Sequence, residues 1–356
     1  MIRIVRRPDP SRRRDIVTRL AAVFAALVCA SLIMAALGYN PVAVFSNIIV
    51  GSTGTAHRIR QTIVKAIPLT TLSLGVAVCF KMKFWNIGAE GQFYLGALFA
   101  TWTAYHFKTL PAGALLPLMF AASLIGGGLW ALIPAVLKSK FRTSEILVTL
   151  MLNYVATKFI TYLQYGPWKD PSAGGFAKMP KFVDAAVLPK LFGVHIGWII
   201  VLVLALAVHI LLAKTKLGYE ISVIGESETT ARYAGISVAG VTAAAVMIGG
   251  GLCGAAGSMQ ASAIEKSLTD QLSAGLGFTA VITAWLARLS APAVVVVSLL
   301  FAALLQGSAY IQTALQVPSA VADILQGVIL FFVLGSEFFL NYRLVRTQSS
   351  EKEAVK

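Results

Sequence analysis

Charged and amide side chains within long apolar stretches are the residues of this sequence best placed to act chemically. Glu90 and Gln92 follow Asn86 in the stretch FWNIGAEGQ, directly before an alanine-rich apolar run. A polar side chain left unpaired in an apolar medium costs about 1–3 kcal/mol, so these groups are expected to face a polar route. Asn86 is expected to cap a helix that carries the other two, and such a glycine-flanked polar start is typical of discontinuous helices that line a transport pathway. The alternative is a helix start at the membrane surface, with Trp85 in the aromatic belt.

A second polar stripe opens a later apolar segment, SEILVTLMLNY. Glu145, Thr149 and Asn153 recur at intervals of four residues, which places them on one face of a helix. Within a bilayer such a face must meet another helix or water. The stripe therefore predicts either bonding between helices or the lining of a polar route. The candidate pathway residues are Asn86, Glu90, Gln92, Thr149 and Asn153.

A polar island at residues 214–237 interrupts the apolar sequence between two segments of membrane length. Ser227 is suited to cap a short helix with Glu228 in its first turn and Arg232 in its last, and Gly235 stands where that helix would stop. The sequence predicts this helix over 226–235, either in a loop that is merely solvated or in a segment that a partner protein grips. Arg and Tyr are frequent interface anchors. The candidate contact residues are Glu226, Glu228, Arg232, Tyr233 and Gly235.

The composition places the chain in a membrane. Of 356 residues, 57% are hydrophobic and 13% are charged, whereas an average soluble domain has about 25% charged residues. A span needs about 20 apolar residues, which predicts an all-α integral membrane protein whose single domain, 1–356, has about ten transmembrane helices. These spans are 16–37, 62–80, 86–107, 112–137, 144–165, 194–213, 238–264, 272–288, 292–313 and 319–342. Pro68 and the turn at 86–91 leave open whether the second and third are broken or continuous, and the eighth is the shortest.

The formal charge of +15 does not indicate nucleic acid, because Lys and Arg cluster at the ends of the apolar blocks. Most of them lie on one side if both termini are inside, which is the positive-inside pattern. This orientation gives a basic cytoplasmic N-terminus (1–15), an extracytoplasmic loop (166–193), a cytoplasmic island (214–237) and a cytoplasmic tail (343–356). The motifs GxxxxGK[ST], HExxH and GxSxG do not occur in the sequence, and its three cysteines lack metal-ligand spacing, so neither a catalytic nor a metal site is predicted.

Three stretches, taken in order, resemble the signature segments of one family: FWNIGAEGQFYLGALFA, SEILVTLMLNYVA and LGYEISVIGESETTARYAGI. They are similar to those of ABC transporter permeases that serve simple sugars, nucleosides and, more distantly, branched-chain amino acids. The nearest likeness is to the nucleoside and general sugar importers, over about residues 60–335. The chain departs from the family at Ala287, where a glycine is usual, and near Trp285, where a smaller residue is usual. These two positions put the local packing in question.

The resemblance implies a half-transporter of the bacterial cytoplasmic membrane, surrounded by lipid. Such a chain pairs with a second permease, which is a copy or a paralogue, and receives its solute from an extracytoplasmic binding protein. Cytoplasmic ATPases, which bind the ATP and Mg, dock on a coupling helix that corresponds to the polar island. The resemblance also implies an inverted repeat that relates spans two to five to spans seven to ten.

The expected function is import of a nucleoside or a simple sugar, with no enzymatic chemistry and no cofactor in this chain. The alternative is a stand-alone, proton-coupled secondary transporter in which Glu90 relays the proton.

Overall fold

Helices account for almost all of the regular structure in the computed structural model, which describes residues 2–6 and 12–346. This confirms the predicted all-α membrane fold. The α-helices are α1 (Arg12–Ala36), α2 (Pro41–Thr53), α3 (Ala56–Lys81), α4 (Ala89–His106), α5 (Ala112–Phe141), α6 (Glu145–Tyr165), α7 (Gly197–Lys214), α8 (Lys216–Glu226), α9 (Glu228–Tyr233), α10 (Val238–Gln260), α11 (Leu276–Leu286), α12 (Ala291–Ala314) and α13 (Ser319–Asn341). The shorter elements are the 3₁₀ turn η1 (Asp184–Ala186), the π-turn η2 (Ala261–Glu265), and the antiparallel pairs β1 (Ile2–Arg6) with β4 (Tyr342–Arg346) and β2 (Lys190–Leu191) with β3 (Val194–His195).

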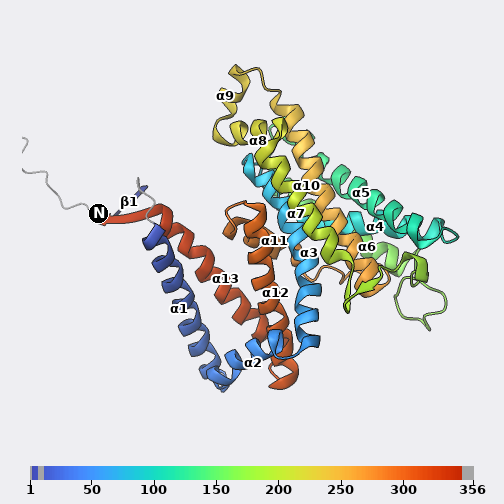
Figure 1. Cartoon of the computed structure of the whole chain (residues 1–356), viewed down its shortest axis with the longest axis horizontal. Coiled ribbons are helices and arrows are strands. Elements are labelled where there is room, and N and C mark those ends of the chain that lie inside the picture. The colour runs from blue at the N-terminus through green and yellow to red at the C-terminus, as the bar shows by residue number, and fades with distance from the viewer. Residues whose placement is uncertain (1, 7–11, 347–356) are drawn as a thin grey trace, which may run out of the picture. The chain divides into compact units, whose positions relative to one another are not determined.

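The described chain divides into two compact units (Figure 1). The larger unit, residues 55–303, contains α3 to α11 and the first half of α12. The smaller unit contains the described residues up to 54 and those from 304 onward. Its core is built from apolar side chains of α1, α2, α12 and α13. These are Ala30, Met34, Val44, Ile48, Ile311, Ala322 and Leu325.

The turn between α1 and α2 is set by local residue chemistry. Gly38 adopts a φ of +84°, which favours glycine. Asn40 then caps α2 by accepting the Val42 N–H at 3.0 Å, and Pro41 occupies the first helical position. The two helices differ in direction by 116°. The first predicted span is thus confirmed as a helix, whereas α2 was not predicted.

Glycines let the helices of the larger unit approach one another closely. α10 packs against α3, α4 and α5. A Cβ on Gly254 of α10 would overlap the carbonyl oxygen of Ser123 in α5, and a Cβ on Gly127 would overlap that of Gly250. The glycine runs at 126–128 and 249–251 predict such close packing from sequence, and the structure confirms it.

Each of the ten predicted spans contains a helix, but their number as membrane crossings stays a prediction. Among the described residues, six helices are long and apolar enough to cross a membrane, or seven if the bent pair α1 and α2 counts as one. α4 is more polar and is not among them, and most of its residues are buried inside the protein. α11 has 11 residues, about 16 Å of helix and half a bilayer. The structure decides the question left open by Pro68, since α3 is continuous through it, whereas residues 82–88 before α4 are irregular.

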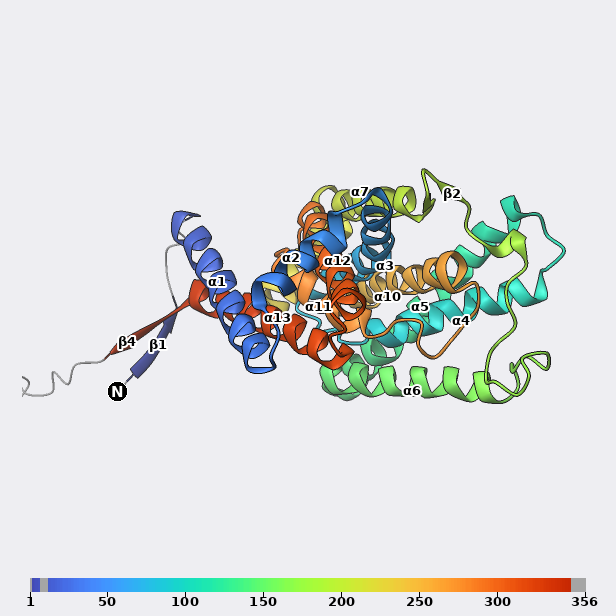
Figure 2. The ribbon, with the colours of Figure 1, turned by 90° about the horizontal axis from the view of Figure 1, so that it is seen from below.

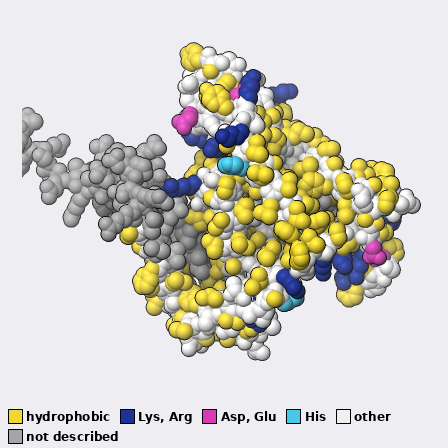
Figure 3. Space-filling view, viewed as in Figure 1, with side chains coloured by type: hydrophobic (Ala, Val, Ile, Leu, Met, Phe, Trp, Pro, Cys, Tyr) yellow, Lys and Arg dark blue, Asp and Glu magenta, His cyan; other side chains and the backbone are white. Residues whose placement is uncertain are grey.

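Charged side chains gather at two places on the larger unit (Figure 3). One group lies over α8 and α9, the other over the segment that follows α6, and apolar side chains cover the surface between them. The segment after α6 is largely irregular, as predicted. Within it, Asp170 accepts hydrogen bonds from the Ser172 hydroxyl and N–H, which lower the pKa of its carboxyl. At the end of this segment, burial and then the charge of Lys190 lower the pKa of His195 to about 4, so its ring is neutral at neutral pH.

The glycine seam generates a test of packing. Replacing Gly254→Ala should lower the unfolding temperature in detergent by several degrees, because the added methyl group meets backbone atoms of α5 and such overpacking costs about 1–3 kcal/mol. Gly113→Ala is the matched control, since a Cβ there has no heavy atom within 4 Å. Equal unfolding temperatures for the two variants, measured by scanning fluorimetry, would contradict the packing described here.

Candidate functional site

A buried carboxylate joins the beginnings of two helices in the larger unit. Glu90 lies in the first turn of α4 and is 7% exposed. Its two oxygens accept the N–H groups of Gly277, at 2.8 Å, and Gly275, at 3.3 Å. Those amides belong to the start of α11, where the first N–H groups lack partners within the helix. The negative charge therefore lies at the positive ends of both helix dipoles.

Glycine is required on the α11 side of this joint. A Cβ on Gly277 would stand 2.6 Å from the Glu90 carboxylate and 2.5 Å from the Glu90 backbone nitrogen. Gly275, the N-cap residue of α11, has a φ of +85°. The stretch thus combines a close backbone approach with a left-handed turn, both of which favour glycine.

The irregular segment before α11, residues 266–275, is held by neighbouring elements. The Tyr94 hydroxyl of α4 donates to the Asp270 carbonyl at 2.7 Å and accepts the Ser273 N–H at 3.3 Å. Gln164 of α6 accepts the Asp270 N–H at 2.9 Å. The chain therefore leaves α10 through η2, passes along α4 and α6 in a series of turns and bends, and enters α11 at Glu90.

Asn86 and Gln92 bind each other beside this joint. The Asn86 amide donates to Gln92 Oε1 at 3.1 Å, and the Gln92 amide donates to Asn86 Oδ1 at 2.9 Å. Asn86 Oδ1 also accepts the Gly88 N–H at 3.0 Å. The expectation that Asn86 is the N-cap of α4 is wrong, because Gly88 holds that position. Asn86 instead lies two residues earlier and fixes the turn that leads into the helix.

The polar stripe of α6 faces the same turn. Asn153 accepts the Gly91 N–H and donates to the Ile87 carbonyl, both at 2.8 Å. Thr149 accepts the Ile87 N–H at 3.3 Å. Of the two interpretations of this stripe, the geometry favours bonding between α6 and the start of α4. The five candidate pathway residues are brought together and all are buried, while their role in lining a route stays a prediction.

The joint also contains groups that sequence reasoning missed. Gly275 and Gly277 contribute backbone amides, and Tyr94, Gln164 and Asp270 hold the segment before α11. A backbone donor has no side chain that marks it in the sequence. The paired glycines of AGLGF are the one signal that could have indicated a close approach here.

The predicted short helix of the polar island is confirmed as α9. Ser227 accepts the Thr230 N–H at 3.2 Å, and Arg232 and Glu228 form an ion pair at 2.8 Å. Gly235 ends the helix with a φ of +75°, and the Ile236 N–H closes the turn on the Ala231 carbonyl at 3.0 Å. Tyr233 is 90% exposed. The preceding helix, α8, was not predicted.

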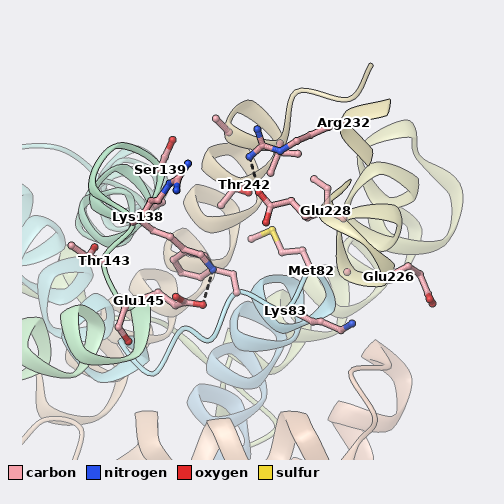
Figure 4. A pocket seen from close by; sticks show the side chains of 18 residues that line it. Met82, Lys83, Lys138, Ser139, Thr143, Glu145, Glu226, Glu228, Arg232 and Thr242 are labelled. Atoms are coloured by element: carbon pink, nitrogen blue, oxygen red, sulfur yellow. Dashed lines mark hydrogen bonds and ion pairs between the residues drawn. The ribbon is translucent and has the colours of Figure 1, made fainter. Parts of the chain in front are cut away.

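A cleft of about 870 Å³ lies beside α9 (Figure 4). Its walls come from α9, the end of α5, the beginnings of α6 and α10, and the turn after α3. Lys138 of α5 pairs with Glu145 of α6 at 2.7 Å across one wall, and the Glu228–Arg232 pair lies on another. Its other charged residues are Lys83, Arg142 and Glu226. The cleft therefore offers charges of both signs next to an exposed helix.

The two departures from the family pattern pack well. The Trp285 ring lies 5.3 Å from that of Trp85 and 6.1 Å from that of Phe80, centre to centre. Ala287 is 3% exposed and caps the C-terminus of α11. The Trp285 side chain, which is larger than the residue usual in the family, is thus accommodated in an aromatic cluster at the end of α11.

The larger unit thus combines a joint of two helix starts with an exposed helix beside a charged cleft. The family model described as a branched-chain amino acid transport system permease component matches residues 58–334. A glucose ABC transporter permease of Haloferax volcanii is 35% identical over 92% of this chain and 89% of its own. A guanosine ABC transporter permease of Bacillus subtilis is 30% identical (91% and 94%), and a nucleoside ABC transporter permease of Lactococcus lactis subsp. cremoris is 26% identical (97% and 98%).

The chain belongs to this permease family of ABC transporters, as its sequence motifs indicate. It is a membrane-embedded transport subunit and not an enzyme.

The joint at Glu90 generates a test that does not depend on transport. Glu90→Ala removes the acceptor of two buried amides, and each unpaired amide costs about 1–3 kcal/mol, so the unfolding temperature in detergent should fall clearly. Glu90→Gln keeps one carbonyl acceptor and should lower it less. Glu265→Ala is the control, because that glutamate is exposed. A loss in Glu90→Ala no larger than in Glu265→Ala would contradict the joint.

Proposed function

We propose that this chain forms the membrane-spanning half of a binding-protein-dependent importer that moves a nucleoside or a simple sugar across the bacterial cytoplasmic membrane. Separate ATPase subunits bind the ATP and Mg and power the movement. The observation that carries the proposal is α9, a capped and exposed helix beside a charged cleft, in a chain whose relatives are permeases named for glucose, guanosine and nucleosides.

The ATPase binds at α9 and the adjoining cleft. Arg232 and Tyr233 project from the helix, with the Arg232 side chain 68% exposed and Tyr233 90% exposed. Exposed Arg and Tyr side chains are the commonest energetic anchors of protein interfaces. The charges of both signs in the cleft fit a partner segment that itself carries both signs. Glu228 pairs with Arg232 within the helix, Gly235 ends it, and Glu226 lines the cleft beside it.

The remaining partners follow from the orientation with both termini in the cytoplasm. The 166–193 segment then lies outside and contributes to docking of the substrate-binding protein. A second permease chain completes the transporter. Asn86, Glu90, Gln92, Thr149 and Asn153 form the polar support of the route through the larger unit.

A proton-coupled secondary transporter is less well supported. In that mechanism Glu90 exchanges a proton during each cycle. The Glu90 carboxylate instead accepts two backbone N–H groups of α11, and protonation would weaken both bonds.

The orientation is tested by labelling intact cells with an impermeant maleimide. Ser172 is exposed in the 166–193 segment, and Thr229 is exposed on α9, where its side chain takes no part in capping. Ser172→Cys should be labelled from outside and Thr229→Cys should be labelled after the cells are opened. Cys29→Ala provides the background, because Cys79 and Cys253 are buried. Labelling of Thr229→Cys in intact cells would overturn the orientation.

The coupling role is tested with the double variant Arg232→Ala and Tyr233→Ala. Truncating one interface anchor costs about 2 kcal/mol or more, which corresponds to about 30-fold in affinity. The double variant should therefore weaken ATPase binding by at least that factor, measured by co-purification. Uptake should fall with it, while the membrane fold persists because both side chains are exposed. The double variant Lys190→Ala and Phe192→Ala removes an exposed basic and aromatic pair elsewhere and should leave co-purification unchanged. Normal co-purification and normal uptake in the first variant would show that another segment grips the ATPase.

A further inference from the structure

One face of α6 is exposed and carries a lysine within its C-terminal half. The buried face of the helix consists of Thr149, Asn153, Ala156, Ile160, Leu163 and Gln164. Lys158 is exposed and lies about 160° around the helix from Ile160. Tyr154 and Tyr162, one turn before and one turn after it, are 60% and 63% exposed. Figure 2 shows α6 along one edge of the larger unit.

Lipid is a poor cover for this face. Lys158 lies seven residues, about 10 Å, from the C-terminal end of a helix that is long and apolar enough to span the membrane. Helical side chains tilt toward the N-terminus, so the Lys158 side chain is directed away from the nearer end and toward the middle of the bilayer. A lysine near the centre of a lipid-facing helix costs about 2.5–3.5 kcal/mol. The Lys158 side chain makes no hydrogen bond or ion pair with any residue that the structure describes.

The exposed face of α7 shows the contrast. There the exposed large side chains Leu202, Val203 and Leu206 are aliphatic, as expected for a surface against lipid. The exposed polar residues of α7, His209 and Lys214, lie within its last six residues. On α6, Tyr154 stands about 14–16 Å from both ends of the helix, too deep for the aromatic belts at the membrane surfaces. The exposed face of α7 therefore suits lipid over most of its length, whereas the exposed face of α6 does not.

A close helix–helix seam does not fit this face either. Seams between membrane helices rely on small residues, as α10 does with Gly250 and Gly254 against α5. The exposed face of α6 consists of large side chains. These are Leu147, Met151, Tyr154, Val155, Lys158, Phe159, Tyr162 and Tyr165. Among them, Tyr154, Lys158 and Tyr162 have a polar tip on an apolar body, and such exposed side chains are suited to a water-filled space.

We propose that the face of α6 formed by Tyr154, Lys158 and Tyr162 is a wall of the water-filled route and contacts the transported solute. The inference rests on the proposed function and specifies its solute class. The tyrosine rings offer flat surfaces on which a nucleobase or the apolar face of a sugar can stack. Stacking of a base on an aromatic side chain contributes about 1–3 kcal/mol in other proteins. The Lys158 ammonium donates hydrogen bonds to hydroxyl or carbonyl oxygens and repels cations. The route therefore takes neutral or anionic solutes with a flat face.

The test measures water access and solute contact on the assembled transporter. In the Cys29→Ala background, Lys158→Cys and Tyr162→Cys are treated with a charged, membrane-impermeant thiosulfonate. Val203→Cys is the matched control, because Val203 is 60% exposed and lies six residues from one end of α7. Thiols react as thiolates, which form in water and not in lipid, so Lys158→Cys should react faster than the control by roughly tenfold or more. Saturating guanosine or glucose, whichever the Cys29→Ala parent takes up, should slow that reaction.

The outcomes separate this inference from the proposed function. Reaction of Lys158→Cys and Tyr162→Cys no faster than Val203→Cys, in a parent that transports normally, would overturn the wall and leave the function intact. Fast reaction that the transported solute does not slow would overturn solute contact. A parent that takes up neither guanosine nor glucose would count against the proposed function, while the comparison with Val203→Cys would still decide whether the face is wet. As a second measurement, Lys158→Met should raise the KM for uptake and Lys158→Arg should largely restore it; an unchanged KM in Lys158→Met would contradict solute contact.

Discussion

The Glu90 carboxylate lies in the first turn of α4 and accepts two N–H groups at the start of α11, and so joins these two helices within the larger unit. Two helix starts that approach each other bring together two positive dipole ends and several unpaired N–H groups. A buried anion offsets both, and Gly277 gives it room. Each helix is preceded by an irregular segment, 82–88 before α4 and 266–275 before α11. This pairing fits the inverted repeat that the family resemblance implies, because third and eighth spans are partners in such a repeat.

α6 connects the features that bear on function. Thr149 and Asn153 bind one side of it to the turn before α4. Glu145, at its beginning, pairs with Lys138 in the wall of the cleft beside α9. Its opposite face carries Lys158 between two tyrosines. A rigid helix of 21 residues thus reaches from the proposed ATPase contact to the proposed solute contact. Displacement at the cleft would move the wall of the route directly.

The features that sequence reasoning predicted correctly are those encoded within a few residues. The cap at Ser227, the Glu228–Arg232 pair and the stop at Gly235 lie within one short stretch, so α9 could be predicted almost residue by residue. The partners of Glu90 could not, because they are backbone amides 185 and 187 positions away. α2 was missed because its 13 residues are too few for a span. Lys158 was visible as a lone charge in an apolar segment, but its position on the exposed face depends on which side of α6 the other helices cover.

The central claim is that conformational changes driven by separate ATPase subunits move the solute, while Glu90 stays bound to the start of α11 and carries no proton. The most direct measurement is uptake of guanosine or glucose into proteoliposomes containing the chain alone or the complete transporter. We expect uptake by the complete transporter that requires ATP at the ATPase side, and no uptake by the chain alone under an imposed pH gradient. Gradient-driven uptake by the chain alone, abolished by Glu90→Gln, would contradict the account and make Glu90 a proton carrier.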